Sequence, residues 1–322
     1  MRIASQVYRQ YLVSKGIKEL AWSLLRKILI KFFNDPACSM MIHGRLLNLP
    51  LSHQLPAVMK HCRFYDKLPK RIAEYIHRYN GRVICIDVGA NIGDTIASLY
   101  NDETDLFLAI EPSEKFNKFL TENWSWNKGV FFVDDICSAV SSEDMFKFEN
   151  NRGTSRVFKS EGGAKIRQRK LDDILVDHPA FMNANFLKID TDGYDFEVIK
   201  GAERFLSQNT PMVLFECDAF ENSNYVEDCM TAMKFFKKCG YNYFLLYNDL
   251  GNLMGKHSLN DLTAFKSLLF FEMTSNIFVF DILVMKDDDV FQFYKSEIGY
   301  YTDNMSNKSL KRTAIVATEM TL

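Results

Sequence analysis

The stretch that decides the fold runs from residue 83 to residue 95 and reads Val-Ile-Cys-Ile-Asp-Val-Gly-Ala-Asn-Ile-Gly-Asp-Thr. Its first half is a short apolar run, which is typical of a strand buried in a parallel sheet. The glycines that follow predict a turn, after which the chain enters a helix. Asp87 comes at the end of the strand, beside backbone N–H groups that the turn exposes. This unit predicts a ligand site at the turn.

The loop differs from a dinucleotide-binding loop in its glycines and in its charge. A dinucleotide site uses Gly-x-Gly-x-x-Gly and a helix N-terminus that receives pyrophosphate. Here two glycines are flanked by Asp87 and Asp94, and two carboxylates repel a phosphate but suit a cationic group. The exposed backbone N–H groups of residues 89–93 can hold a carboxylate. S-adenosylmethionine carries both groups. The predicted donor-site residues of this loop are Asp87, Gly89, Asn91, Gly93, Asp94 and Thr95.

A second acidic residue stands where such a site needs it. In this architecture the acid that takes the ribose hydroxyls follows about 20 residues later, at the end of the next strand. Glu111 closes the apolar run 105–110, and Pro112 and Ser113 then suit the start of a helix. Helix capping alone would explain either Asp87 or Asp94, but not Glu111 at the matching strand end. We therefore predict that Glu111 binds the ribose.

With these residues the sequence resembles the FkbM family of S-adenosylmethionine-dependent methyltransferases, over about residues 40 to 285. Residues 86–94 look like the family's first motif, and residues 110–112 look like its second-strand acid. Residues 170–175 look like the helix that precedes the next strand. The resemblance implies a methyltransferase that uses S-adenosylmethionine, with a sugar hydroxyl or a similar natural-product hydroxyl as acceptor.

The most specific part of the resemblance is Phe-Leu-Lys-Ile-Asp-Thr-Asp-Gly-Tyr-Asp at residues 186–195. It is similar to the family's Lys-Ile-Asp-Val-Glu-Gly-Ala-Glu signature. The departures are Thr191 for Val, Asp192 for Glu, Tyr194 for Ala and Asp195 for Glu. Carboxylates are kept, but with shorter reach, so we expect a different substrate side. The sequence at 151–155 resembles the family's glycine-serine loop, where Arg152 or Arg156 could meet an acidic substrate or simply lie in a solvated turn.

Strand and helix patterns alternate from residue 83 to residue 247, which predicts an α/β fold with a doubly wound, mostly parallel Rossmann-like sheet of the class I methyltransferase type. A last strand pattern at 276–285 is expected to supply an antiparallel edge. The predicted organisation is an amphipathic helical extension at 1–36, a methyltransferase domain at 37–290, and a helix with a polar, mobile tail at 291–322.

Composition limits the partners and the compartment. The chain has 39 basic and 41 acidic residues, a net charge of -2, and no evident basic stripe, so we expect no nucleic-acid partner. Its seven cysteines form no Cys-x-x-Cys pair and no cleavable signal is evident, which predicts free thiols in the cytoplasm. The sequence gives no indication of the oligomeric state.

The segment 21–33 is apolar at helical spacing and basic elsewhere. Its lysines and arginine interrupt every run long enough to cross a bilayer. One interpretation is an interfacial helix that meets the inner face of a membrane peripherally. The other is a helix packed on its own domain or on a second subunit, which is the ordinary meaning of an amphipathic stripe. In the first interpretation the apolar contacts would be Trp22, Leu25, Ile28, Leu29, Phe32 and Phe33.

Acidic residues also follow the later strands, and the carboxyl ends of parallel strands meet at one edge of the sheet. Asp135, after the third strand, is our candidate for the adenine amine. Asp192 is the candidate base, with Asp190 placing the methionine end or acting as the base itself, and Glu216 is a second candidate. A capping role for Asp190 is equally compatible with the sequence. No spacing is diagnostic of a metal, so no metal ligand is predicted, although an all-oxygen magnesium site is a minor alternative. His257, in a Gly- and Asn-rich stretch, is a further candidate base or an exposed histidine.

The sequence thus predicts an S-adenosylmethionine-dependent O-methyltransferase that acts on a small molecule or glycan. The preference for oxygen over nitrogen is what the family resemblance implies. The Asn-Pro-Pro-Tyr or Asp-Pro-Pro-Tyr turn of amino-methylating nucleic-acid enzymes is absent, and the fourth strand ends in Asp-Thr-Asp-Gly instead. Two rival functions remain. One is a nonenzymatic module that binds S-adenosylmethionine, and the other is a nicotinamide-dependent oxidoreductase, which the charges of Asp87 and Asp94 disfavour.

Overall fold

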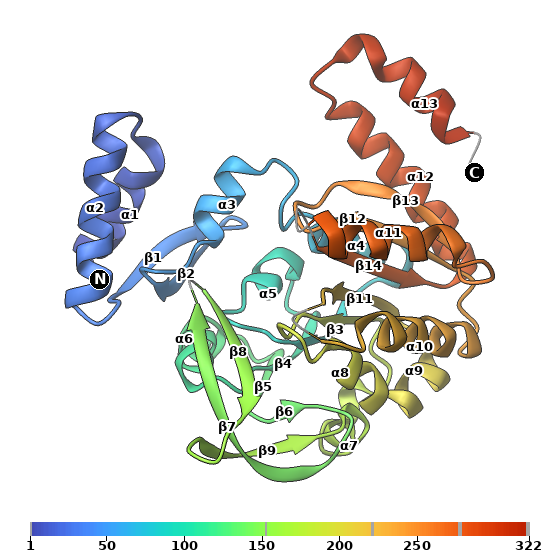
Figure 1. Cartoon of the computed structure of the whole chain (residues 1–322), viewed down its shortest axis with the longest axis horizontal. Helices are drawn as coiled ribbons and strands as arrows, with labels where there is room; N and C mark the ends of the chain where they lie inside the picture. Colours follow the sequence, from blue (N-terminus) through green and yellow to red (C-terminus); the bar gives the residue numbers. More distant parts are fainter. Residues whose placement is uncertain (1, 152, 220–221, 276–278, 320–322) are drawn as a thin grey trace.

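A central sheet of eight strands forms the body of the molecule (Figure 1). The structure is a computed structural model that describes residues 2–151, 153–219, 222–275 and 279–319. In spatial order the strands are β13 (Leu253–Ser258), β12 (Tyr243–Asn248), β14 (Phe280–Met285), β11 (Met212–Cys217), β10 (Phe186–Ile189), β3 (Ile84–Val88), β4 (Leu106–Ile110) and β5 (Val130–Val133). The five strands from β11 to β5 are mutually parallel. The predicted α/β fold with a mostly parallel sheet is confirmed.

The antiparallel strands lie at one end of this sheet. β14 runs antiparallel to both of its neighbours, β11 and β12, so it lies inside the sheet and not at its edge as we expected. Five of its six residues are buried, which suits a strand with neighbours on both sides. The antiparallel edge is β13, which is partly exposed along its length. Residues 276–278 of the predicted strand lie outside the described part of the chain.

Helices cover both faces of the sheet, because side chains alternate between the faces along each strand. Val83 and Cys85 belong to one apolar cluster, whereas Ile84 and Ile86 belong to the other. The first face is covered by α4 (Leu68–Asn80), α5 (Asp94–Leu99), α6 (Glu114–Trp124) and α12 (Asp287–Asp303). The second face is covered by α7 (Leu171–Asp177), α8 (Asp195–Gly201), α9 (Glu203–Asn209), α10 (Tyr225–Lys238) and α11 (Thr263–Ser275).

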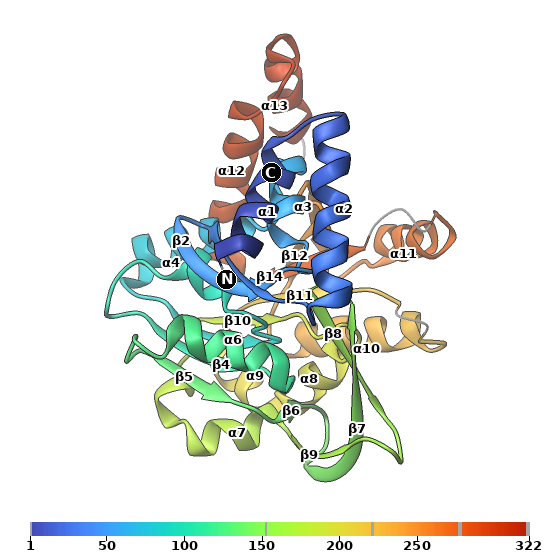
Figure 2. The same ribbon diagram turned by 90° about the vertical axis from the view of Figure 1, so that its left-hand side faces the viewer.

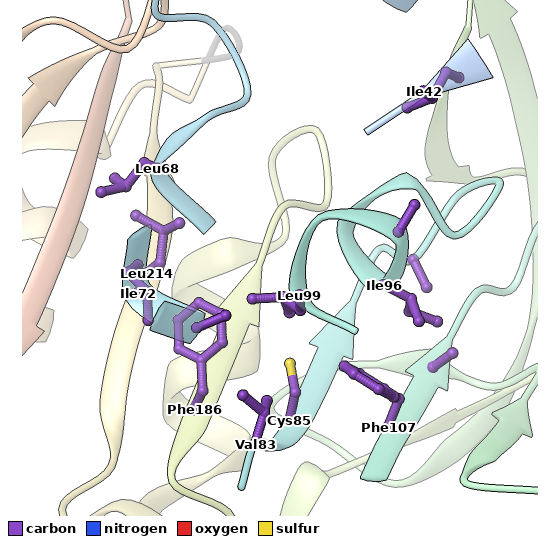
Figure 3. Close-up of a cluster of buried hydrophobic side chains, with 14 of the residues drawn as sticks. Ile42, Leu68, Ile72, Val83, Cys85, Ile96, Leu99, Phe107, Phe186 and Leu214 are labelled. Atoms are coloured by element: carbon purple, nitrogen blue, oxygen red, sulfur yellow. The ribbon is translucent and has the colours of Figure 1, made fainter. Parts of the chain in front are cut away.

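The core of the first face fixes the position of the glycine turn. Figure 3 shows Cys85 of β3, Phe107 of β4 and Phe186 of β10 pointing to the same side as Ile96 and Leu99 of α5. All of these side chains are at least 99% buried. Full burial of one such side chain stabilises the fold by roughly 1.5–3 kcal/mol. This packing holds α5 against the strands and therefore sets where the turn between β3 and α5 lies.

Three further groups of elements surround this body. A hairpin of β1 (Ala37–Ile42) and β2 (Arg45–Pro50) carries α1 (Arg2–Val13) and α2 (Ile17–Phe32) on one side, and α3 (Leu55–His61) follows it. A second sheet, which the sequence did not indicate, has the order β6 (Ile136–Cys137), β9 (Ala164–Arg169), β7 (Ser142–Asn151) and β8 (Thr154–Lys159). Beyond α12, the expected mobile tail is instead helical over α13 (Lys311–Glu319).

Gly89 lies where the turn after β3 passes closest to β10. Its φ is +84°, and a Cβ atom there would lie 1.7 Å from the carbonyl oxygen of Asp190. Gly81, which follows α4, has the same φ of +84° but nothing within 4 Å of its Cβ position. Only glycine therefore fits at residue 89 for reasons of both backbone and space.

We expect Gly89→Ala to lower the free energy of unfolding about 1–3 kcal/mol more than Gly81→Ala, because the added methyl group overpacks the approach to β10. Gly81→Ala should cost about 1 kcal/mol, from the left-handed backbone alone. Urea unfolding followed by circular dichroism measures both. Equal losses would show that β3 and β10 do not approach as described.

Candidate functional site

A cavity of about 410 Å³ opens beyond the carboxyl ends of β3, β4 and β10. This volume lies in the range of small-molecule sites, about 300–1,000 Å³. The place is the one where ligands bind open parallel sheets. Seven of the predicted site residues line it: Gly89, Asn91, Asp94, Thr95, Glu111, Asp190 and Asp192.

The glycine turn is held open by backbone hydrogen bonds to the next strand. Gly89 N and Ala90 N both donate to the carbonyl oxygen of Ile110, at 2.9 Å and 3.1 Å. Asn91 has a left-handed backbone with φ of 49°, and its side-chain Nδ2 donates to Gly153 O at 2.7 Å. The turn is therefore fixed to β4 on one side and to the β7–β8 hairpin on the other.

Glu111 is the acidic group of the second strand end. Its Oε2 accepts from Asn91 N at 2.9 Å, and its Oε1 accepts from Ser113 N at 2.8 Å. The residue is 6% exposed. Burial raises the pKa of Glu111 to about 7, against the opposing effect of the two backbone N–H groups. Each oxygen keeps a further lone pair, so the carboxylate can accept two hydroxyl groups from the cavity.

Asp87 and Lys188 form a buried ion pair at the cavity, in which Lys188 lines the cavity and Asp87 lies behind it. They are register partners on β3 and β10, with 3.8 Å between Lys188 Nζ and Asp87 Oδ1. Burial raises the pKa of Asp87 to about 6, although Lys188 lowers it. Burial lowers the pKa of Lys188, but the charges of Asp190 and Asp87 raise it well above its usual value. Lys188 therefore stays charged and reaches Asp190 Oδ2 at 2.9 Å.

The turn after β10 brings two more carboxylates to the cavity. Asp190 has a half-exposed side chain, 51% accessible. Asp192 has a left-handed backbone, with φ of 50°. Burial and the charge of Asp190 raise the pKa of Asp192 to about 6, and the Ser155 backbone N–H opposes this. Asp195, by contrast, accepts from Thr191 Oγ1 at 2.7 Å and begins α8, so its role is structural.

His53 lines the cavity as well, although no motif in the sequence predicts a role for it. It is 6% exposed, and burial lowers the pKa of its imidazole to about 4. Nδ1 accepts from Leu55 N at 3.2 Å, so Nε2 carries the proton and faces Asn91 Oδ1 at 3.3 Å. The neutral ring thus holds the Asn91 amide with its Nδ2 toward Gly153. Other wall residues that we did not predict are Tyr65, Cys137, Thr154, Ser155 and Tyr194.

Comparison with known families gives one match, to residues 87–243. It is a match to the methyltransferase FkbM domain. The matched range begins at buried Asp87, ends at the first residue of β12, and covers slightly less than half of the chain. The resemblance predicted from the sequence motifs is confirmed. No curated protein matches the chain in sequence.

Solved methyltransferases resemble the structure weakly. A methyltransferase FkbM from Methylobacillus flagellatus is 16% identical over 60% of this chain and 55% of its own, with a TM-score of 0.37. A precorrin-6y C5,15-methyltransferase from Geobacter metallireducens is 13% identical over 68% of this chain and 87% of its own, with a TM-score of 0.36. An S-adenosylmethionine-dependent O-methyltransferase from Thermotoga maritima is 11% identical over 78% of each, with a TM-score of 0.35. This chain spans about half of the length of the first. Similarity at this level carries no argument about activity.

Within the matched range, two predicted donor residues, Asp87 and Gly93, do not line the cavity. Asp87 lies behind the cavity wall, in the ion pair with Lys188. Gly93 packs against Trp124, whose indole Nε1 donates to Gly93 O at 2.9 Å. A Cβ on Gly93 would lie 2.3 Å from that nitrogen. Glycine is therefore needed at residue 93 to pack α6 against the start of α5.

Asp135, our candidate for the adenine amine, does not line the cavity. Its oxygens accept from Arg167 Nε at 2.7 Å and from the same guanidinium at 2.9 Å. The carboxylate is 4% exposed and faces the second sheet, because β9 brings Arg167 to it. The next two residues, Ile136 and Cys137, line the cavity instead. The contact could not be predicted from the sequence, because the sequence did not indicate the second sheet that carries Arg167.

Glu216 also lies outside the cavity wall. It is inside β11, opposite Asp281 of β14, and it lines two further hollows beside the turn after β10. Burial and the charge of Asp190 raise the pKa of Glu216 well above its usual value. Glu216 lies apart from the cavity that Asp190 and Asp192 line.

The remaining candidates lie elsewhere. His257 is on edge strand β13 and stacks on Phe244, with 5.2 Å between the ring centroids. The sheet order places it far from β3 and β4. Arg152 lies outside the described residues. Within the described ranges, no group of three or more His, Cys, Asp or Glu side chains is arranged to hold a metal ion.

We expect Lys188→Met to lower the free energy of unfolding by about 3–5 kcal/mol near neutral pH, because it leaves Asp87 charged and unpaired at 0% exposure. The pKa of Asp87 is raised in the folded protein, so below its unfolded value both states are protonated and the penalty disappears. The loss should therefore be large at about pH 8 and small at about pH 4.

Urea unfolding of wild type and variant at both pH values measures this difference. Lys200→Met is the matched control, because Lys200 pairs with Glu197 at 2.8 Å while its side chain is 40% exposed. An exposed pair contributes about 0–1 kcal/mol. A Lys188→Met loss as small as that of the control would contradict the buried pair.

Proposed function

We propose that this protein transfers the methyl group of S-adenosylmethionine to a hydroxyl group of a sugar or natural product. The observation that carries the proposal is the single cavity that joins the glycine turn, Glu111 and the turn after β10 in the FkbM domain. S-adenosylmethionine supplies an activated methyl group on a sulfonium centre. The residues of this chain then have to bind that donor, align an acceptor and accept a proton.

The cavity walls fit the chemistry of the donor. Glu111 presents two oxygens with free lone pairs to a pair of ribose hydroxyls. The turn at Gly89 has no side chain to obstruct the cavity, and its backbone faces a wall with the carboxylate of Asp94. Negative charge on the wall suits the cationic sulfonium and ammonium groups and disfavours a phosphate.

Proton acceptance falls to Asp192 in this proposal. A hydroxyl acceptor must lose its proton when the new O–C bond forms. Asp192 lines the cavity, and with a pKa near 6 it is ionised at neutral pH yet basic enough to take that proton. Asp190 is held by Lys188 at 2.9 Å and places the neighbouring turn. Alignment of acceptor and donor supplies most of the rate enhancement in such transfers.

A hollow next to the cavity supports a polyhydroxyl acceptor. Asp66, Asp190, Glu216, Asp249 and Asp281 border it. Glu216 Oε2 and Asp249 Oδ1 are buried and lack a hydrogen-bond partner among the described residues. Carboxyl groups of this kind accept hydrogen bonds from sugar hydroxyls. Lys188, Asp190 and Tyr65 line both spaces, so an acceptor held in the hollow can reach the cavity.

Binding of S-adenosylhomocysteine should depend on pH and on Glu111. Isothermal titration calorimetry of wild type should show affinity that falls as the pH is lowered from about 8 to about 5, because Glu111 and Asp94, with pKa values near 7, lose their charge. Glu111→Gln should weaken binding about tenfold or more, because one charged acceptor is lost.

Glu122→Gln on the exposed side of α6 is the matched control and should leave the affinity unchanged. Reduced nicotinamide dinucleotide is the control ligand and should not bind. Preference for the dinucleotide, or affinity that is indifferent to both pH and Glu111, would contradict the donor site.

Asp192→Asn should lower kcat about 100-fold or more while leaving S-adenosylhomocysteine affinity intact, because the amide cannot accept the proton. Transfer of a labelled methyl group to a panel of sugars measures the rate. Asp134→Asn, at an exposed aspartate after β5, is the control. Full activity of Asp192→Asn would remove the base from the proposal. Binding without any transfer by wild type would favour a nonenzymatic module.

A further inference from the structure

The N-terminal arm, defined here as residues 2–33, carries more basic than acidic residues. It contains α1 and α2, and Phe33 caps the end of α2. The arm stands on the β1–β2 hairpin at the edge of the body (Figures 1 and 2). Residues 1–33 contain seven Lys and Arg residues and one acidic residue, Glu19, although the whole chain has a net charge of -2. Positive charge is thus concentrated on one projecting element.

One side of α2 packs on the protein. The guanidinium of Arg26 lies 4.2 Å from the centre of the Tyr8 ring of α1. Leu29 and Ile30 pack against the apolar cluster that includes the first face of the sheet. Trp22 and Leu29, which we expected among the lipid contacts, are half-buried. The packing interpretation of the segment therefore holds for this side of the helix.

The opposite side of α2 is an exposed apolar stripe. Its members recur at a spacing of three or four residues, so they lie on one face of the helix. A helix that packs this face on its own domain would bury these side chains. None of the residues of α2 is buried. The stripe consists of Ile17 (86% exposed), Leu20 (70%), Leu24 (61%), Leu25 (37%), Ile28 (39%) and Phe32 (71%).

Exposed lysines flank the apolar stripe on both sides. At 100° per residue, Lys27 falls beside one edge of the stripe, Lys31 just inside that edge, and Lys18 beside the other edge. A helix with an apolar centre and a basic rim lies in the interface of a membrane, where lysines meet anionic headgroups and apolar side chains enter the acyl boundary. In the ranges that the structure describes, no helix is both long enough and apolar enough to cross a membrane.

We propose that the apolar stripe of α2 docks this protein peripherally on an anionic membrane surface. Charge complementarity selects this occupant over a second copy of the chain, because a two-fold contact between stripes would bring the lysines of both arms together. An apolar face of this size on a basic helix matches lipid in both respects: the centre removes apolar area from water and the rim meets negative charge.

The arm is fastened to the wall of the cavity. Arg26 donates to the carbonyl oxygens of Leu51, Ser52 and His53, at 2.9 Å, 3.1 Å and 3.1 Å. The hydroxyl of Tyr8 also donates to His53 O. Because His53 lines the cavity, docking of α2 holds the cavity at a fixed position relative to the membrane. If the proposed function is right, this geometry suits an acceptor that is itself attached to lipid.

Vesicle flotation of the full chain tests the docking surface directly. The vesicles contain phosphatidylcholine alone, or phosphatidylcholine with about one third phosphatidylglycerol. The wild type should partition to the anionic vesicles, and less so at high salt. Leu24→Glu with Ile28→Glu should lower the partition about tenfold or more, because two apolar contacts become charged. Lys27→Glu with Lys31→Glu should also lower it about tenfold or more.

Val176→Glu is the matched control, because Val176 of α7 is 63% exposed, close to Leu24 at 61%. It should partition like wild type. All substituted positions are exposed, and circular dichroism confirms that the variants fold. Failure of wild type to float with anionic vesicles would overturn the proposal. So would a dimer in sedimentation velocity that the Leu24→Glu, Ile28→Glu variant alone dissolves, since the stripe would then face a second copy. Neither result depends on methyl transfer, so the docking and the activity are tested separately.

Discussion

The buried pair of Asp87 and Lys188 is the interaction on which the site depends. It joins β3 to β10 at the one place where both strands end, and Lys188 then holds Asp190 at 2.9 Å. Burial removes both charges from water, which is costly. Loss of either partner would leave the other charge buried without compensation. The close approach of Gly89 to the Asp190 carbonyl belongs to the same constraint. Together they leave the cavity open between two strands that are locked side by side.

Peripheral elements complete the cavity from several directions. The β7–β8 hairpin supplies Gly153 to Asn91, and the loop after β2 supplies His53 to the same side chain. The N-terminal arm holds that loop through Arg26. Asn91 is therefore the point at which the sheet, the second sheet and the arm meet. Segments outside the central sheet therefore supply part of the cavity wall.

The sequence predicts the sheet and the strand-end acids because both depend on local pattern. Apolar runs that end in an acid mark β3 and β4, and the expected contacts of Glu111 follow from strand order alone. The roles of Asp135 and His53 could not be read this way, because Arg167 and Asn91 reach them from segments far away in sequence. The position of Glu216 could not be predicted either, because β14 pairs with β11 and places Asp281 opposite Glu216, away from the cavity. Contacts between distant segments decide which carboxylates are free to act.

A crystal structure of the protein with S-adenosylhomocysteine tests the central claim most directly, which is that the three strand ends form one donor site. We expect the ribose hydroxyls on Glu111, the amino acid end of the ligand beside Gly89 and Asn91, and the sulfur facing Asp192, with the ion pair of Asp87 and Lys188 unchanged. A ligand bound elsewhere, or one that displaces Lys188 from Asp87, would contradict it.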